Sequence, residues 1–300
     1  MVAIDATLPH AKRVLVQRRF ATTMIAVPTA GVICAFAMVS HEGTISLVAL
    51  ALFGCFYFAS VIGLEIGFHR YFSHRSFKCG PALRFILAFL GSIAGEGPVL
   101  FWAATHRRHH AVADTEDDPH GPLKPGLAGF IRAHMGWLFE PQTLEMGRIC
   151  PDLIRDRTTM FAQRFYFLWV ALGLLLPSAI GFMFHGARGA FDGFLWGGLV
   201  RIFIAHHATW SINSMCHLFG TRGHDTDDAS RNLAPLALLT LGGSWHNNHH
   251  AFPRSAFNDF RWWQIDPSAW LIRLAAKASL VWDVQSPLSR PPRRSQHEPA

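Results

Sequence analysis

Nine histidines gather in four short stretches of a chain that is 50% apolar and holds 18 histidines among its 300 residues. Neutral imidazole is a general ligand for iron, zinc and copper, so such clusters in an apolar chain indicate a metal site. The stretches HRYFSH, HRRHH, NSMCH and HNNHH supply His69, His74, His106, His109, His110, His217, His246, His249 and His250.

The spacing of these histidines predicts which rings converge. Residues i, i+3 and i+4 share one face of a helix, so the three histidines of HRRHH can meet at one point, and so can the three of HNNHH. Asn213 and His217 are one helical turn apart. His69 and His74 are five residues apart, which fits a regular helix poorly, and we expect the helix to end or unwind near Tyr71 and Phe72.

Nine ligands are more than the four that a tetrahedral zinc needs, and they suit two metal ions with four or five ligands each. The five cysteines form no CxxC pair, which disfavours a zinc–thiolate or iron–sulfur site. Glu-x-x-His pairs are absent from the sequence, which disfavours a carboxylate-bridged di-iron bundle. The sequence therefore indicates a histidine-rich site for two metals.

Other polar residues could surround these ligands. Asp114 and Asp118, in the segment DTEDDPH, either hydrogen-bond the ring nitrogens of the ligands or belong to a solvated loop. His206 and His207 precede Asn213 by one to two turns and, with His120 and His134, are further candidates. The remaining histidines are expected to be ordinary surface or core residues: His10, His41, His185, His224 and His297.

Four apolar runs predict the architecture. They cover approximately residues 22–40, 45–68, 165–185 and 191–213, each near the roughly 20 residues that cross a bilayer. Short connectors join them in pairs, so we expect an all-α integral membrane fold with four transmembrane helices in two hairpins. A cytosolic helical cap would comprise residues 69–164 and 214–284 and hold the histidines. The alternative, a soluble protein with buried core helices, is disfavoured because two runs exceed the roughly 18 residues typical of a membrane span.

Shorter segments complete this picture. Residues 80–95 are apolar but too short to span, so an interfacial or re-entrant helix is expected there. Residues 1–20 resemble a cytosolic lead-in without a signal peptide, and residues 285–300 are predicted to be a disordered tail.

The charge pattern predicts the orientation. The formal charge of +7 comes from scattered basic residues rather than a basic stripe with interleaved aromatics, so nucleic acid is not an expected partner. Basic residues are concentrated in the lead-in, the tail and the segment between the second and third runs. By the positive-inside rule, both termini and both histidine-bearing segments face the cytoplasm.

A di-metal site at a membrane face indicates oxygen chemistry on a lipid. Two Fe(II) ions can reduce O2 to an oxidant that takes hydrogen from an unactivated C–H bond, while the protein holds an alkyl chain and excludes water. A membrane metal carrier or sensor is the alternative from another class. It is disfavoured because the histidines lie near the cytosolic ends of the runs rather than along a path through them.

The chain resembles the membrane fatty acid desaturases of the Δ9, stearoyl-CoA desaturase-like family, in their bacterial branch. The resemblance covers roughly residues 45–284 within a single domain 1–284 and rests on GFHRYFSHRSFK, FWAATHRRHH, DDPHGP, HMGWLF, TWSINSMCHLFG, SWHNNHHAFPRSA and RWWQIDP.

The resemblance implies an enzyme that introduces a cis double bond, at Δ9, into a saturated acyl chain in the bacterial inner membrane. The nine histidines would hold two iron ions, with a water held by Asn213 and O2 as co-substrate. Trp102 and Trp210 are candidate walls of a bent acyl tunnel. A hydroxylase or other oxygenase on the same centre is the nearest rival.

Two departures from the family limit what the resemblance implies. Many relatives carry Glu in GEGWHNNHH or GESWHNNHH, whereas this chain has Gly243 in GGSWHNNHH, so a carboxylate near the metals is expected to be missing. The segment EGPVLFWAAT lacks the polar and basic residues with which animal relatives contact coenzyme A. The acyl carrier therefore stays open between coenzyme A, a membrane lipid and an acyl carrier protein.

Electrons must come from a separate protein. The sequence has neither a heme-binding His-Pro-Gly-Gly segment nor a GxGxxG after a strand. The expected donor is a ferredoxin, a rubredoxin or a cytochrome with its reductase, and an acidic donor would be attracted by the basic cytosolic surface.

Overall fold

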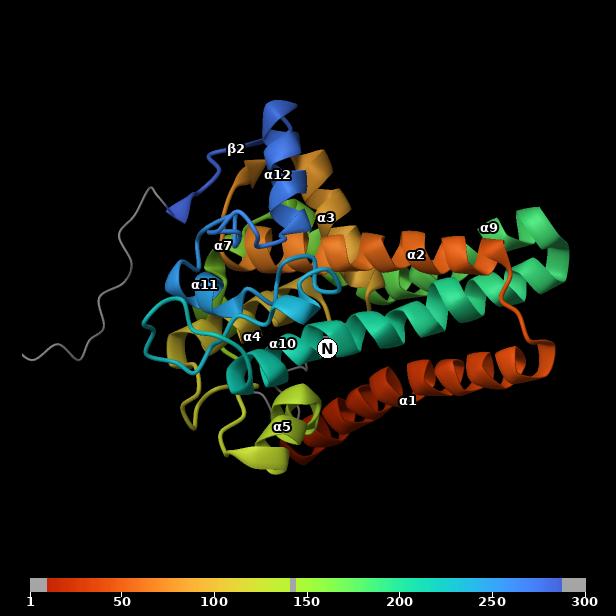
Figure 1. The fold of residues 1–300 in the computed structure, drawn as a ribbon, viewed down its shortest axis with the longest axis horizontal. Coiled ribbons are helices and arrows are strands. Elements are labelled where there is room, and N and C mark those ends of the chain that lie inside the picture. Colours follow the sequence, from red (N-terminus) through yellow and green to blue (C-terminus); the bar gives the residue numbers. More distant parts are fainter. Residues whose placement is uncertain (1–9, 141–143, 288–300) are drawn as a thin grey trace, which may run out of the picture.

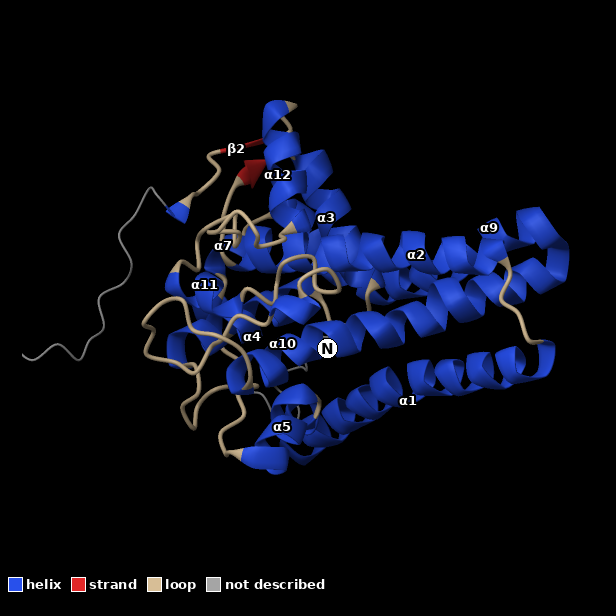
Figure 2. Cartoon of the chain, viewed as in Figure 1, coloured by secondary structure: helices blue, strands red, loops and turns tan. Residues whose placement is uncertain are grey.

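The computed structural model describes residues 10–140 and 144–287, and these are mostly helical (Figure 2). Within these described residues, three helices are long and apolar enough to cross a membrane: Ala11–Glu42, Leu47–Ser73 and Tyr166–Leu218. They lie side by side, and the shorter helices and loops gather at one end of them (Figure 1).

The first hairpin joins α1 (His10–Glu42) to α2 (Leu47–Ile62), which continues into η1 (Gly63–Ser73). Ser46 caps α2, its Oγ accepting a hydrogen bond from the Ala49 N–H at 3.1 Å. Phe36 and Leu47 are 75% and 83% exposed, which suits contact with lipid rather than water. The helix α1 begins at His10, so the described part of the predicted lead-in is helical and continuous with the first apolar run.

The second hairpin is one continuous helical stretch that reverses direction. It consists of α9 (Tyr166–Asp192), η3 (Gly193–Val200) and α10 (Arg201–Leu218). The reversal lies at His185 and Gly186, where Gly186 adopts φ 56° and ψ −142°, a region that a residue with a side chain rarely enters. The described residues therefore contain three helical stretches long enough to cross a membrane, whereas the sequence predicts four. The third stretch, however, has two apolar arms, and they meet at His185, where the third run is predicted to end.

Glycines bring these two arms into close contact. A Cβ on Gly181 would lie 2.0 Å from the carbonyl oxygen of Gly189 on the opposite arm. The Ser178 Oγ also donates a hydrogen bond to the carbonyl of Ala190 at 2.9 Å. Only a residue without a side chain permits this approach, so the turn and the tight pairing depend on the same feature of the sequence.

Arg201 joins the hairpins deep inside the bundle, where its side chain is fully buried. Its guanidinium donates to Ser60 Oγ at 3.0 Å and to the carbonyls of Ile93, Gly173 and Gly197 at 2.5, 2.5 and 2.9 Å. A cation in an apolar bundle is tolerated only when its donors are satisfied in this way.

The cap consists of short helices and a small sheet. Its helices are α3 (Pro81–Ile93), α4 (Val99–Val112), α5 (Gly126–His134), η2 (Gly136–Phe139), α6 (Met146–Ile149), α7 (Pro151–Ile154), α8 (Arg157–Arg164), η4 (Ala234–Leu236), α11 (His246–Ala251) and α12 (Pro267–Lys277). β1 (Lys78–Cys79) pairs antiparallel with β2 (Val281–Trp282). The described residues are otherwise helices and loops, as the all-α prediction expects. The one addition is this short pairing, which joins the end of the described chain to the segment after the first histidine stretch.

The beginning of the predicted disordered tail is ordered. The Gln285 N–H donates to the carbonyl of Ser76 at 2.8 Å, and the Gln285 carbonyl accepts from the Ala256 N–H at 2.9 Å. These two bonds continue the attachment of the C-terminal segment to the cap beyond the pairing of β1 with β2. Residues 288–300 of the predicted tail, with His297 among them, lie outside the described residues.

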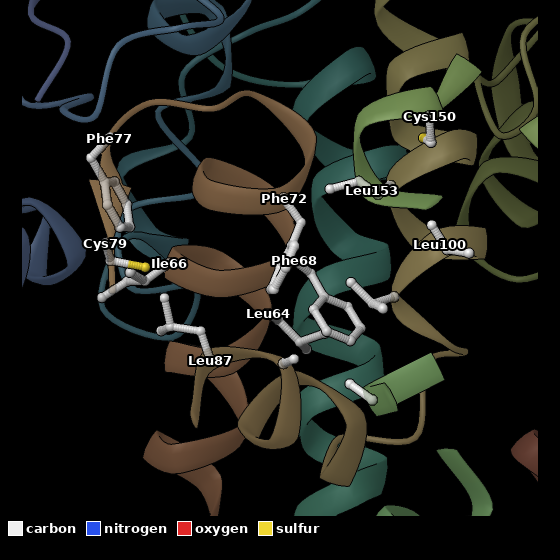
Figure 3. Packing of buried hydrophobic residues seen from close by; sticks show 14 of the residues in the cluster. Leu64, Ile66, Phe68, Phe72, Phe77, Cys79, Leu87, Leu100, Cys150 and Leu153 are labelled. Atoms are coloured by element: carbon white, nitrogen blue, oxygen red, sulfur yellow. The ribbon is translucent and has the colours of Figure 1, made fainter. Parts of the chain in front are cut away.

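A hydrophobic core fixes η1 against the cap. Phe68 and Phe72 of η1 pack among Leu87 of α3, Leu100 of α4 and Leu153 of α7 (Figure 3). Phe68 and Phe72 are at most 1% exposed, and burial of each ring contributes roughly 1.5–3 kcal/mol. Because this core holds η1 and α4 together, it also fixes the relative positions of the histidines that they carry.

We predict that Arg201→Ala destabilises the protein strongly. The substitution leaves several buried acceptors without a donor, at about 1–3 kcal/mol each, and should lower the melting temperature in detergent by roughly 5–10 °C. Arg188→Ala is the matched control, since Arg188 pairs with Glu42 and Asp192 at an exposed end of the bundle and its loss should change the melting temperature little. Equal melting temperatures for the two variants would contradict the role assigned to Arg201.

Candidate metal centre

The helix η1 explains how His69 and His74 come together although they are five residues apart. η1 is a π-helix from Gly63 to Ser73, and the His74 N–H donates to the His69 carbonyl at 3.1 Å. In this wider helix residues i and i+5 lie near one another, and the two imidazole centroids are 5.0 Å apart. The prediction that the helix ends or unwinds between these two histidines is confirmed, since η1 is a wider helix that ends at Ser73, one residue after Phe72.

The other histidines come from three elements. The HRRHH stretch lies in the last turns of α4, HNNHH forms most of α11, and His217 lies in the last turn of α10. The elements α4, α10 and α11 meet at the cap end of the long helices (Figure 1). Within α4 and α11 the i, i+3, i+4 spacing places the rings together, as the sequence predicts.

The nine rings form two groups that could each hold a metal ion. Within each group, one ring nitrogen from every histidine lies within 4.8 Å of the others. The first group is His69, His74, His106, His110 and His249, and the second is His109, His217, His246 and His250. The groups adjoin, since the ring centroids of His110 and His250 are 4.4 Å apart.

Facing nitrogens in the first group are separated by the distance that metal ligands require. The Nε2 atoms of His74 and His106 are 2.7 Å apart, and His249 Nε2 lies 2.9 Å from the Nε2 atoms of both His69 and His110. Two adjacent ligands on a metal with bonds of about 2.1 Å are about 3 Å apart. The donors of this group therefore fit a bound cation.

The second group has the same geometry. Nε2 of His217 lies 3.0 Å from Nε2 of His246, and Nε2 of His109 lies 3.3 Å from Nε2 of His250. Four imidazoles leave room for one more ligand on a metal with five.

Two predicted carboxylates orient rings of the second group. Asp118 lies with both carboxylate oxygens 3.0 Å from His109 Nδ1, and Asp114 Oδ2 lies 2.9 Å from His217 Nδ1. A carboxylate on Nδ1 fixes the tautomer in which Nε2 offers its lone pair to a metal. Of the two readings for DTEDDPH, the contacts favour the one in which its carboxylates serve the ligands.

Two further carboxylates were not identified from the sequence. Asp228 Oδ2 lies 2.7 Å from His250 Nδ1, and Glu65 Oε1 lies 3.1 Å from His69 Nδ1. Glu65 could have been found from its i, i+4 spacing to His69, but Asp228 is brought to His250 only by the fold. The carboxylate expected to be missing at Gly243 is thus present, because Glu65 supplies one from another element.

Burial sets the charge state of these groups. Desolvation, with the proximity of other imidazoles, holds the pKa well below the usual range for His74, His106, His110, His246 and His249. These rings are therefore neutral at pH 7 and can bind a metal. Although burial opposes ionisation of Asp118, the neighbouring His109 lowers the pKa of this carboxyl below its ordinary value.

The remaining predicted histidines have different positions. His120 stacks on His109 with ring centroids 4.3 Å apart, beside the second group. His206 Nε2 pairs with the carbonyl of Ala94 at 2.8 Å, and His207 Nδ1 pairs with His134 Nε2 at 2.9 Å. The sequence predicts that His206 and His207 lie next to the ligands, but in the structure they bond to Ala94 and His134 instead.

Two small cavities, each of about 40 Å³, adjoin the histidines. Trp102 and Asn213 line both cavities, and Trp210 lines the second. Trp102 also stacks on His106, with ring centroids 5.1 Å apart. The candidate tunnel residues therefore border space next to the ligands.

Glu96 is a buried acid in the second cavity that was also not identified from the sequence. Its Oε2 accepts a hydrogen bond from Trp102 Nε1 at 3.0 Å. Burial raises the pKa of Glu96 to about 7, so this carboxyl is partly protonated at neutral pH. It fixes the Trp102 ring that stacks on His106.

We predict that Asp118→Asn weakens metal retention by about 10–100-fold, because His109 loses the carboxylate that orients it. Metal content of the purified protein and the rate of metal loss to a chelator measure this. Asp117→Asn is the matched control: its side chain is 77% exposed, and retention should not change. Equal losses in both variants would show that Asp118 does not act through His109.

The comparisons with known proteins agree with this geometry. Residues 43–284 match the family model described as fatty acid desaturase. The chain is 42% identical over 273 residues to hex-5-enoyl-[acyl-carrier protein] acetylenase of Moorena producens, covering 88% of this chain and 85% of the relative.

Other relatives are named as enzymes that act on lipids. The sn-1 stearoyl-lipid 9-desaturase of Anabaena variabilis is 35% identical, with 83% of this chain and 88% of the relative covered. Delta-9 acyl-lipid desaturase 1 of Arabidopsis thaliana is 33% identical, with 98% and 94% covered. The chain belongs to the membrane fatty acid desaturase family and is an oxidoreductase that acts on acyl chains.

Proposed function

We propose that the two histidine groups hold two iron ions and that the protein uses them with O2 to desaturate a fatty acyl chain. The observation that carries this is the convergence of nine buried imidazoles into adjacent groups of five and four. An all-nitrogen donor set without a thiolate suits iron. Asn213, which borders both cavities one turn before His217, would hold a water that completes the smaller group.

When bound, the iron pair supplies the power to activate O2 and remove two hydrogens from neighbouring carbons. The overall reaction converts CH2–CH2 and O2, with two electrons and two protons, to CH=CH and two waters. The residues of this chain position the acyl chain and exclude water. Val61, Leu64 and Ile212 give the first cavity an apolar wall, and Trp102 closes it against His106.

The proposed product is a cis double bond at Δ9, as in the relatives named as 9-desaturases. A second candidate is conversion of an alkene to an alkyne on an acyl carrier protein, favoured by the 42% identity to a relative named for that reaction. A hydroxylase on the same centre remains the chemical rival. The relative at 42% identity also makes an acyl carrier protein the proposed carrier, ahead of coenzyme A and lipid.

The proposed topology places four apolar arms across a bacterial inner membrane, with the cap and both termini in the cytoplasm. The exposed apolar surfaces of the two hairpins support this placement, since Phe36 and Met183 are 75% and 82% exposed. Electrons would come from a separate ferredoxin, rubredoxin or cytochrome. A metal carrier is disfavoured because the histidines gather at one end of the arms.

Expression in a bacterial host of known lipid profile tests the reaction. Mass spectrometry of acyl chains, both membrane-bound and released from acyl carrier protein, should find a new double bond and locate it. A terminal alkyne on carrier-bound chains would replace the Δ9 assignment with the acetylenase. An alcohol as the sole product would overturn desaturation, and metal uptake into vesicles without O2 consumption would overturn the enzyme assignment altogether.

We predict that His249→Ala abolishes the product and lowers the iron content by at least half, while the protein still inserts into the membrane. His249 Nε2 faces both His69 and His110, so its loss opens the centre of the first group. His41→Ala, at the exposed end of α1, serves as the control and should keep both product and iron. Wild-type turnover in the His249 variant would refute the ligand assignment.

A further inference from the structure

Glu65 is a buried carboxylate placed between a metal ligand and the interior of the cap. It lies in η1, four residues before His69, and is 6% exposed. Its Oε1 lies 3.1 Å from His69 Nδ1, within ion-pair distance but not aligned for a hydrogen bond. This nitrogen is opposite the Nε2 that faces His249. Glu65 also borders the first cavity.

Arg70 holds this carboxylate in place. Its Nε and Nη2 donate to Glu65 Oε1 at 3.3 and 3.1 Å. Arg70 is anchored in turn by Asp266 Oδ1 at 3.0 Å and by the carbonyl of Ala256 at 2.7 Å. Asp266 caps α12 through the Ala269 N–H at 2.9 Å, so the chain of contacts runs from His69 to a helix start in the cap.

Gly243 provides the space for Glu65. A Cβ at position 243 would lie 2.9 Å from Glu65 Oε2 and 2.8 Å from Ile212 Cδ1. Gly242 has φ 97° and requires glycine for its conformation, whereas Gly243 is not among the positive-φ glycines. The backbone at 243 would thus accept a side chain, and the space for one is taken up by the Glu65 carboxylate together with the end of the Ile212 side chain.

We propose that Glu65 is a positioning residue for His69 and that the absence of a side chain at Gly243 makes room for it. A carboxylate can occupy this space from position 65 in η1 or from position 243, but not from both. The inference rests on the proposed iron site. The negative charge of the carboxylate 3.1 Å from Nδ1 favours the His69 tautomer that carries its proton there. This tautomer leaves the Nε2 lone pair free for the first group and makes the ring a stronger ligand. The pair 65/243 therefore controls how firmly the first group holds iron.

A double-mutant cycle tests this exchange. The variants are Glu65→Ala, Gly243→Glu and the combination of both, with Glu65→Gln as a variant of nearly unchanged shape and Glu116→Ala as an exposed carboxylate control. The readouts are iron per chain after purification in detergent, the rate of iron loss to a chelator, and the midpoint potential of the bound iron.

The expected results follow from the geometry. Glu65→Ala should lose iron about 10–100-fold faster than wild type. Glu65→Gln should shift the midpoint potential in the positive direction, because a negative charge that favours the oxidised metal is gone. Gly243→Glu alone should lower the yield or melting temperature, since two carboxylates then compete for one space. The combined variant should retain iron better than Glu65→Ala, which a purely structural role for Glu65 would not explain.

Two results would overturn the inference. One is an unchanged iron-loss rate and midpoint potential in both Glu65 variants, and the other is a combined variant that loses iron as fast as Glu65→Ala. Failure of the proposed function is recognised separately: wild type that binds iron but alters no acyl chain removes the desaturase proposal, while the iron-loss rates still decide the role of Glu65. A wild-type protein that binds no iron would contradict both the proposed function and the inference about Glu65.

Discussion

Imidazole nitrogens that face one another at about 3 Å repel through their lone pairs unless a proton or a metal cation lies between them. In this protein the rings of two adjacent groups face each other in this way, and burial disfavours protonation of most of them. A bound cation would relieve this repulsion, but the rings must first be brought together by other contacts. The elements η1, α4, α10 and α11 must therefore be fixed by contacts outside the metal site, so that the rings are already assembled when metal arrives.

Those contacts are of two kinds. On one side, the Phe68 and Phe72 core packs η1 against α3 and α4. On the other, carboxylates on the outer ring nitrogens tie the ligands to neighbouring segments, as Asp228 does for His250 and Asp114 for His217. Each of these carboxylates also accepts a hydrogen bond from a backbone N–H or from an arginine. The orientation of the rings therefore depends on segments of the cap that do not touch the rings themselves.

The apolar arms lead up to the histidine site. The small cavities lie where α2, η1 and α10 enter the cap, beside Trp102 and Asn213. An acyl chain reaching this place would leave water behind, and the apolar walls would hold its carbons near the histidines. The same arms carry Arg201, whose hydrogen bonds to Ser60 and three carbonyls keep the two hairpins in register beneath the site.

Much of this protein followed from the sequence alone, because its strongest signals are local. Histidine spacings of three and four residues and long apolar runs depend only on helix geometry and bilayer thickness, so the ligand groups of α4 and α11 and the apolar arms could be predicted. The tertiary structure decided what depends on distant contacts. The widening of the helix at His69, the pairing of β1 with β2 and the order at Gln285 all result from packing against the cap. Likewise, only the fold brings Asp228 to His250 and Glu65 into the space beside Gly243, because those partners lie on separate elements whose approach no local pattern records.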